Sequence, residues 1–101
     1  MVAAGGLFAE IARDRSLRLA PIDLATAQEM IAEVRGLIPL AGYRGRPKAD
    51  LAALAHAMVA LSHLADDPSV AEAEINPLIV RPARQGGVIA VDALVKLAGN
   101  A

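Results

Sequence analysis

Two segments in the middle of the chain repeat apolar residues every three or four positions. The first begins after Asp23, a residue type that favours the N-cap of a helix, and ends at Gly36, which is well placed to stop one. The second begins after Asp50 and ends before Pro68, because the residue preceding a proline is disfavoured in helical conformations. This spacing predicts two amphipathic helices. Their apolar stripes comprise Leu24, Ala27, Ile31 and Val34, and then Leu51, Leu54, Met58, Leu61 and Ala65.

Both ends of the chain instead alternate apolar and polar residues, which is the period of a strand. Residues 7–12 and 16–19 predict a hairpin that turns at 13–15, and residues 73–80 and 88–94 predict a second hairpin. The resulting element order, ββ-α-α-ββ, predicts an α+β fold in which an antiparallel sheet is covered by two helices.

Glycine and proline mark the turns and loops. Residues 82–87 contain Pro82 and two glycines and predict the turn of the second hairpin. Residues 39–47 contain two glycines and two prolines, so an irregular connection between the helices is expected there, and not a helix. With 101 residues, the chain is long enough for one domain, residues 1–101, and too short for two.

Composition and charge exclude several classes of function. The formal net charge is −1 and the chain has one Phe, one Tyr and no Trp, which argues against binding nucleic acid. No cysteine is present, so disulfides, thiolate chemistry and Cys-ligated zinc are excluded. The apolar stretches are too short to span a bilayer, and the N-terminus lacks the basic region of a secretory signal. A cytoplasmic domain with no membrane partner is therefore expected.

Candidate chemistry lies in the second hairpin. Alternation in its first strand places Glu74, Asn76 and Leu78 on one face, and Ile75, Pro77 and Ile79 on the other. Pro77 cannot donate a ladder hydrogen bond, so this strand is expected at an edge, or with that position facing outward.

A hairpin folded symmetrically about Arg84 would bring Asn76 opposite Asp92. Directly opposed residues of an antiparallel pair have Cβ atoms about 4.5–5.5 Å apart, so both side chains could reach one ion. Carboxylate and amide oxygens suit Mg²⁺, which takes few protein ligands. The hypothesis is a metal site of Glu74, Asn76 and Asp92. The alternative is that these are solvated surface groups, and a register slip of one residue would separate them.

The same residues resemble a known family. Glu74-Ile75-Asn76-Pro77-Leu78 followed by Val91-Asp92 resembles the metal-binding strand pair of the ATP-grasp domain in succinyl-CoA synthetase and its relatives. The N-terminal stretch Gly5-Gly6-Leu7-Phe8-Ala9-Glu10, then Asp14, then Arg18-Leu19-Ala20-Pro21, resembles the corresponding stretch of ADP-forming acyl-CoA synthetases. Gly42-Tyr43-Arg44-Gly45-Arg46-Pro47 is similar to a loop of that family. The resemblance runs from Gly5 to about Leu97 and implies the C-terminal lobe of an ATP-grasp domain.

In that family the Asn and the second-strand Asp bind the Mg²⁺ that bridges the phosphates of ATP. The resemblance therefore implies Asn76 and Asp92 as ligands of Mg²⁺ (or Mn²⁺), with Glu74 as a supporting or water-mediated ligand, and ATP or ADP as the nucleotide. It also implies the reaction of an NDP-forming acid–thiol ligase. An acyl-CoA, NDP and phosphate interconvert with a carboxylate, CoA and NTP through an acyl phosphate and a phosphohistidine.

Two arginines are candidate phosphate contacts. Arg18 lies in a matching motif, and Arg44 lies between glycines that allow the backbone to approach a ligand. The alternative for each is a solvated surface position. For Glu10 and Asp14 a structural salt bridge or turn is favoured over catalysis.

His56 and His63 are seven positions apart on the second helix, away from its leucines. No third metal ligand is in register with them, and the resemblance places the phosphorylated histidine of the family elsewhere. A surface position is favoured for both, and no catalytic residue is assigned in this chain.

The resemblance covers only the second lobe of an ATP-grasp domain. It implies that the partners are the remaining lobe and the CoA-binding domains, and that the chain supplies metal and phosphate contacts without being catalytic alone. The alternative is a stand-alone, non-catalytic binding or interaction module. An exposed apolar surface where the first lobe would pack would favour the synthetase fragment and could also drive homodimer formation.

Overall fold

The computed structural model describes residues 1–5, 14–42, 45 and 47–99. Its two α-helices are α2, Leu24–Glu33, and α3, Leu51–Ser62. Each begins at the predicted N-cap: Asp23 Oδ1 accepts the backbone N–H of Thr26 at 2.8 Å, and Asp50 Oδ1 accepts that of Ala53 at 3.0 Å. Two 3₁₀ helices, η1 (Arg35–Ala41) and η2 (His63–Asp66), follow the α-helices directly. In this part of the chain no helix is long and apolar enough to cross a membrane.

The connection between the helices is more ordered than the sequence predicts. Helix α2 ends at Glu33, and η1 then runs through Pro39, where an irregular loop was expected. The physical reason is a pair of caps. The Asp14 carboxylate accepts the backbone N–H groups of Arg35 and Gly36 at 2.8 and 2.7 Å at the start of η1. At its other end Gly42, in the left-handed region with φ of 94°, donates to Pro39 O at 3.2 Å.

Gly36 does not stop a helix, contrary to the sequence-based interpretation. It lies inside η1, and a Cβ at this position would stand 2.6 Å from Ala4 Cβ and 3.1 Å from Asp14 Oδ2. A separation of 2.6 Å between two carbons is far inside van der Waals contact. Glycine is therefore needed here for close packing of the N-terminal segment against η1.

The first strand pair also differs from expectation. Strand β1, Val2–Ala3, pairs antiparallel with β2, Arg15–Ser16, so that Ala3 is opposite Arg15. Arg15 is thus a strand residue and not part of the predicted turn. The predicted strand at residues 7–12 lies outside the described residues.

The second hairpin is present, but each of its long strands is divided in two. Its first arm contains β3, Val70–Ile75, and β4, Leu78–Val80. Its second arm contains β5, Val88–Ala90, and β6, Ala93–Leu97. β3 pairs with β6 and β4 pairs with β5, both antiparallel. The turn falls where the sequence predicts it, with Gln85 N and Gly86 N both donating to Pro82 O at 2.9 Å.

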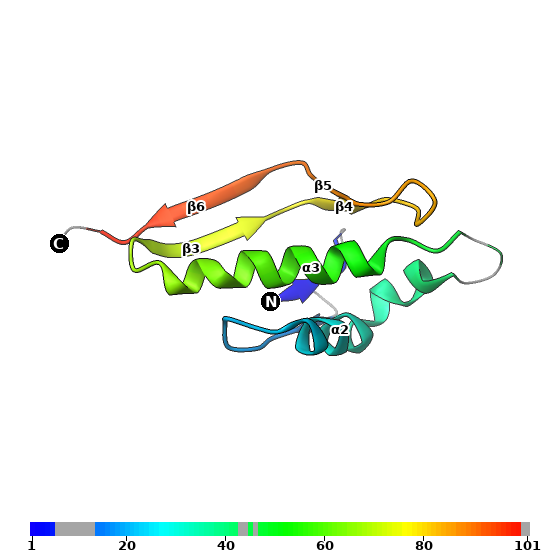
Figure 1. Ribbon diagram of the computed structural model, residues 1–101, viewed down its shortest axis with the longest axis horizontal. Coiled ribbons are helices and arrows are strands. Elements are labelled where there is room, and N and C mark those ends of the chain that lie inside the picture. Colours follow the sequence, from blue (N-terminus) through cyan, green and yellow to red (C-terminus); the bar gives the residue numbers. More distant parts are fainter. Residues whose placement is uncertain (6–13, 43–44, 46, 100–101) are drawn as a thin grey trace.

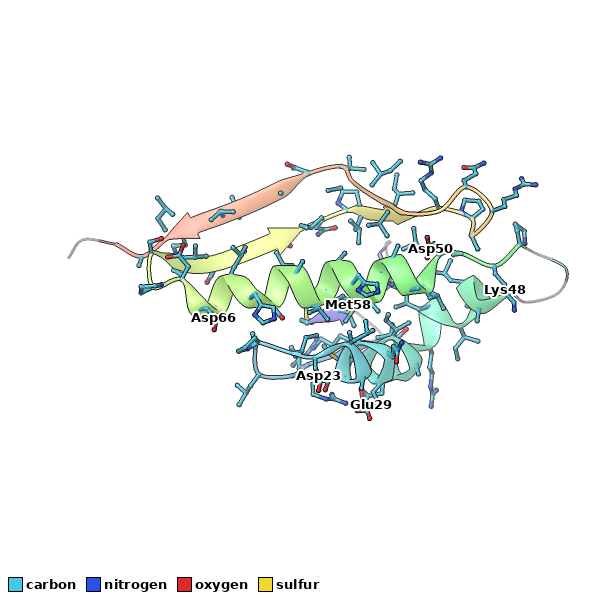
Figure 2. All side chains as sticks on the ribbon, in the orientation of Figure 1. Asp23, Glu29, Lys48, Asp50, Met58 and Asp66 are labelled. Carbon is cyan, nitrogen blue, oxygen red and sulfur yellow. The ribbon has the colours of Figure 1, made fainter. Side chains whose placement is uncertain are left out.

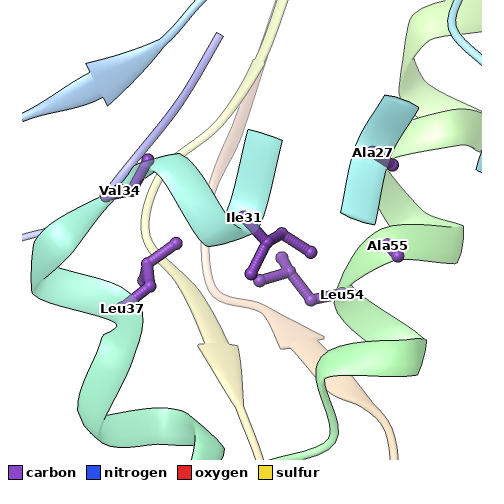
Figure 3. Packing of buried hydrophobic residues seen from close by; sticks show 6 residues of the cluster. All are labelled: Ala27, Ile31, Val34, Leu37, Leu54 and Ala55. Atoms are coloured by element: carbon purple, nitrogen blue, oxygen red, sulfur yellow. The ribbon is translucent and has the colours of Figure 1, made fainter. Parts of the chain in front are cut away.

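The α+β class is confirmed, but the layering is different from the predicted one. Within the described residues the strands form three two-stranded pairs and not one sheet. Helix α3 lies between the hairpin and α2, so the two helices do not share one sheet face (Figure 1). The core fills the space between α2, η1 and α3 (Figure 3), with Leu78, Val80 and Val88 of the hairpin packed against it. Its buried residues are Ala27, Ile31, Val34, Leu37, Leu54 and Ala55.

Candidate functional site

The two breaks in the hairpin meet each other across the strands. Pairing of Ile75 with Ala93 on one side of the breaks and of Leu78 with Ala90 on the other sets a single register. Between these pairs, the backbone N–H of Asn76 donates to Asp92 O at 3.0 Å. Asn76 therefore lies opposite Asp92, in the register that symmetry about Arg84 predicts. The second break is closed by Val91 N, which donates to Pro77 O at 3.0 Å.

The break at Asn76 and Pro77 changes which side chains share a face. Before it, Ile75 is half-buried while Glu74 and Asn76 are exposed. After it, the exposed Pro77 is followed by Leu78, which is half-buried and packs against the core. The sequence-based assignment of Leu78 to the face of Glu74 and Asn76 is therefore wrong, because two consecutive residues face outward and shift the alternation by one. As a result, the polar residues Glu74 and Asn76 are exposed, while β4, which follows them, packs its Leu78 side chain against the core.

Within this site, hydrogen bonds orient the polar side chains. Asn76 Nδ2 donates to Glu74 Oε1 at 3.4 Å, which directs the amide nitrogen toward the carboxylate. Asp92 Oδ1 accepts the backbone N–H of Ala93 at 2.8 Å. In the described part of the chain, no hydrogen bond is made by Asn76 Oδ1 or Asp92 Oδ2. The site thus presents one amide and one carboxylate oxygen from two facing strands.

The donor set suits a hard cation that takes only a few protein ligands. Oxygen ligands from one amide and one or two carboxylates fit Mg²⁺, which keeps several water or phosphate ligands. Among the described residues, no group of three or more His, Cys, Asp and Glu side chains could hold a metal ion. At a site of Asn76, Asp92 and Glu74, water or phosphate oxygens would have to complete the shell.

Arg18 belongs to a different cluster. Its Nη2 donates to both carboxylate oxygens of Glu33, at 2.6 and 2.8 Å, and its Nη1 donates to Ser16 Oγ at 3.2 Å and to Leu17 O at 2.9 Å. Ser16, the one buried polar residue in the described part of the chain, donates its hydroxyl to Glu33 Oε2 at 2.7 Å. The Arg18 guanidinium, followed by the Ser16 hydroxyl, holds the pKa of Glu33 below its usual range. Sequence reasoning missed Ser16 and Glu33, which lie 17 positions apart.

The other predicted residues are placed as follows. Arg44 and Glu10 lie outside the described residues. Asp14 caps η1 and so has a structural role, as the sequence reasoning favours. His56 is exposed, and His63 Nδ1 lies 3.1 Å from Asp66 Oδ2 on the surface. Neither histidine lies in a metal-ligand cluster of the described chain.

Known proteins resemble this chain over almost its whole length. Residues 1–97 match the family of ATP-grasp domains. The beta subunits of two ADP-forming acetate–CoA ligases of Pyrococcus furiosus are similar to it. One is 37% identical over 101 residues, which cover 98% of this chain and 42% of that protein. The other is 42% identical over 94 residues, which cover 92% of this chain and 39% of that protein. The chain therefore spans about two fifths of these relatives.

Solved structures share the same fold. A dinucleotide-forming acetyl-coenzyme A synthetase of Ca. Korarchaeum cryptofilum, in complex with coenzyme A and Mg-AMPPCP, superposes with a TM-score of 0.82 at 35% identity. The match covers 93% of this chain and 43% of that one. A Pyrococcus horikoshii protein matches with a TM-score of 0.82 at 33% identity, covering 93% of this chain and 40% of its own.

Proposed function

The chain belongs to the ATP-grasp domain family, and on that basis we propose that it supplies the metal-binding half of the nucleotide site of an NDP-forming acyl-CoA synthetase. The observation that supports this most directly is the register of the hairpin, in which Asn76 N donates to Asp92 O and both residues are exposed. The similarity to acetate–CoA ligase subunits and to a synthetase solved with Mg-AMPPCP supports the reaction class.

In this proposal Asn76 Oδ1 and Asp92 Oδ2 bind the cation, Mg²⁺ or Mn²⁺. Glu74 holds the Asn76 amide by accepting from its nitrogen, which leaves the amide oxygen for the ion. Glu74 itself acts as a supporting or water-mediated ligand. When bound, the metal ion would neutralise charge on the phosphates of ATP or ADP. The remaining coordination positions belong to phosphate oxygens and water.

Arg18 and Arg44 are the proposed phosphate contacts of this chain. Arg18 makes an ion pair with Glu33 in which Nη2 alone donates to both carboxylate oxygens, so a phosphate would bind Arg18 beside Glu33 or in exchange for it. The exchange is physically reasonable because both partners are partly exposed, at 34% and 47%, and exposed ion pairs are weak.

The chain spans about two fifths of its relatives, so the partners we propose are the remaining ATP-grasp lobe and CoA-binding domains. The chain would not be catalytic alone. The alternative is a stand-alone binding or interaction module. It predicts that the gene sequence upstream of Met1 does not encode a lysine-containing ATP-grasp lobe in the same reading frame. Finding such a lobe would contradict the module.

The metal site is tested by titrating the chain with Mn²⁺ in the presence and absence of ADP, with binding followed by electron paramagnetic resonance. We expect ADP to strengthen Mn²⁺ binding and Asp92→Asn to weaken it at least tenfold. The matched control is Glu72→Gln, which removes an exposed carboxylate from the same strand pair, where Glu72 is opposite Lys96. Glu72→Gln should bind within twofold of the native chain. Equal Mn²⁺ affinity in the native chain and Asp92→Asn would remove Asp92 from the site.

A further inference from the structure

One carboxylate joins helix α3 to the turn of the hairpin. Asp50 caps α3 through Oδ1, and its Oδ2 accepts the backbone N–H of Gly87 at 2.6 Å, 37 positions away in the sequence. Gly87 has φ of 86°, a left-handed conformation that favours glycine. Figure 2 shows Asp50 at the end of α3 that lies against the β4–β5 hairpin.

Main-chain hydrogen bonds extend this junction on both sides of Asp50. Asp50 N donates to Arg81 O at 2.8 Å, and Ala83 N donates to Lys48 O at 2.7 Å, with Ala49 bridged to Pro82 between them. Residues 48–50 thus pair with residues 81–83, just beyond the end of β4, through an isolated antiparallel bridge. These bonds are directional and restrain sliding of the β4–β5 half along α3, whereas the packing of Leu78 and Val80 on the core is non-directional.

The junction is close to the polar site in the chain. Arg81 is separated from Pro77 by β4, and Gly87 from Val91 by β5, each a span of about 13 Å at the rise of an extended strand. The β3–β6 ladder continues to the far end of the hairpin, where Ala98 N donates to Ser69 O at 2.8 Å. The pairing of Asn76 with Asp92 lies between this end of the ladder and the Asp50 junction.

We propose that Asp50 is a positioning residue for the Asn76–Asp92 site, because it fixes the β4–β5 half of the hairpin on α3 and so the geometry with which the two breaks meet. That Asn76 and Asp92 bind a metal ion rests on the proposed function. The hydrogen bonds from Gly87 and Ala53 hold the pKa of Asp50 below its usual range, so the carboxylate is ionised at neutral pH and accepts both.

Asp50→Asn separates the two contacts of Asp50. An Asn side chain caps a helix about as well as Asp, but its NH₂ group would face the Gly87 N–H, a donor against a donor. Asp50→Ser also keeps a capping oxygen and is too short to offer a second acceptor. The matched control is Asp23→Asn, because Asp23 makes the same cap on α2, to Thr26 N.

The first readout is hydrogen exchange of the Asn76 and Val91 amides, which close the site, measured in the full chain. The Val34 amide, which is buried in the core and donates to Ile31 O at 3.3 Å, is the internal reference, because a buried amide reports a loss of global stability whereas the end of a strand pair frays locally. In Asp50→Asn and Asp50→Ser we expect exchange at Asn76 and Val91 to rise at least fivefold relative to Val34. Asp23→Asn should leave this ratio within twofold of the native value.

The second readout is Mn²⁺ affinity in the presence of ADP. Asp50→Asn should weaken it at least threefold while Asp23→Asn does not. An unchanged exchange ratio in both Asp50 variants would overturn the positioning role. The proposed metal site is contradicted by a different result, namely that Asp92→Asn binds Mn²⁺ as the native chain does. In that case the exchange ratio alone decides whether Asp50 positions the pairing of Asn76 with Asp92.

Discussion

Replacing Gly36 with alanine tests the packing of the N-terminal segment on η1. The added Cβ would lie 2.6 Å from Ala4 Cβ, a short side chain that cannot rotate away, and 3.1 Å from Asp14 Oδ2. Because Asp14 also accepts the N–H groups of Arg35 and Gly36, any shift that relieves the clash lengthens the cap of η1. The substitution is therefore expected to destabilise the fold.

The magnitude follows from two opposing effects. Overpacking a close contact costs about 1–3 kcal/mol, while replacing glycine by alanine stabilises by about 0.4–1 kcal/mol through the unfolded chain. The expected net loss for Gly36→Ala is about 1–2 kcal/mol in the free energy of unfolding. In a domain of this size each kcal/mol lowers Tm by about 4–8 °C.

The assay is urea and thermal unfolding followed by circular dichroism, with a double-mutant cycle. Ala4→Gly removes the atom that clashes, so Gly36→Ala should cost less in its presence, with a coupling of about 1 kcal/mol. Gly5→Ala is the matched control, because a Cβ at Gly5 meets no atom of the described residues within 4 Å. It should change stability by no more than about 0.5 kcal/mol.

Two results would refute this reasoning. Additive effects of Ala4→Gly and Gly36→Ala would show that the two positions do not touch. The second is a higher stability of Gly36→Asn than of Gly36→Ala. Because asparagine tolerates the left-handed backbone conformation, that result would favour the interpretation that Gly36 ends a helix.

Two further predictions concern the core and the Arg18 cluster. Leu54→Ala, at a position only 4% exposed, should lower the free energy of unfolding by about 2–5 kcal/mol in urea denaturation, whereas Leu97→Ala, at a position 66% exposed, should stay within about 0.5 kcal/mol; equal losses would contradict the assigned core. The pKa of Glu33 is lowered in the fold, so its contribution to stability is present above its unfolded pKa of about 4.3 and is lost as pH falls through the lower folded value. Glu33→Gln should therefore reduce the loss of stability between about pH 5 and pH 2 in acid titrations, and an unchanged acid transition would contradict the Arg18–Glu33 pairing.

The sequence predicts the features that depend on neighbouring residues. The caps at Asp23 and Asp50 follow from local chemistry, because a short acidic side chain before an apolar stripe can accept an N–H of the first turn. The opposition of Asn76 and Asp92 follows from the symmetry of a hairpin about Arg84.

Features that depend on distant residues could not be read from the sequence. The cap of η1 comes from Asp14, 21 positions before Arg35, and this contact explains why a segment with Pro39 is helical. The second contact of Asp50, to Gly87, cannot be predicted from the sequence for the same reason, because the two residues are 37 positions apart. Strand alternation also fails at Asn76 and Pro77, because a pattern of period two does not reveal where two consecutive residues face outward.

The measurement that tests the metal site most directly is paramagnetic broadening of the backbone amide signals by Mn²⁺ in the presence of ADP. We expect the strongest broadening at Asn76 and Asp92, and its loss in Asp92→Asn. Broadening centred on another exposed carboxylate such as Asp66, with the Asn76 and Asp92 signals unchanged, would contradict it.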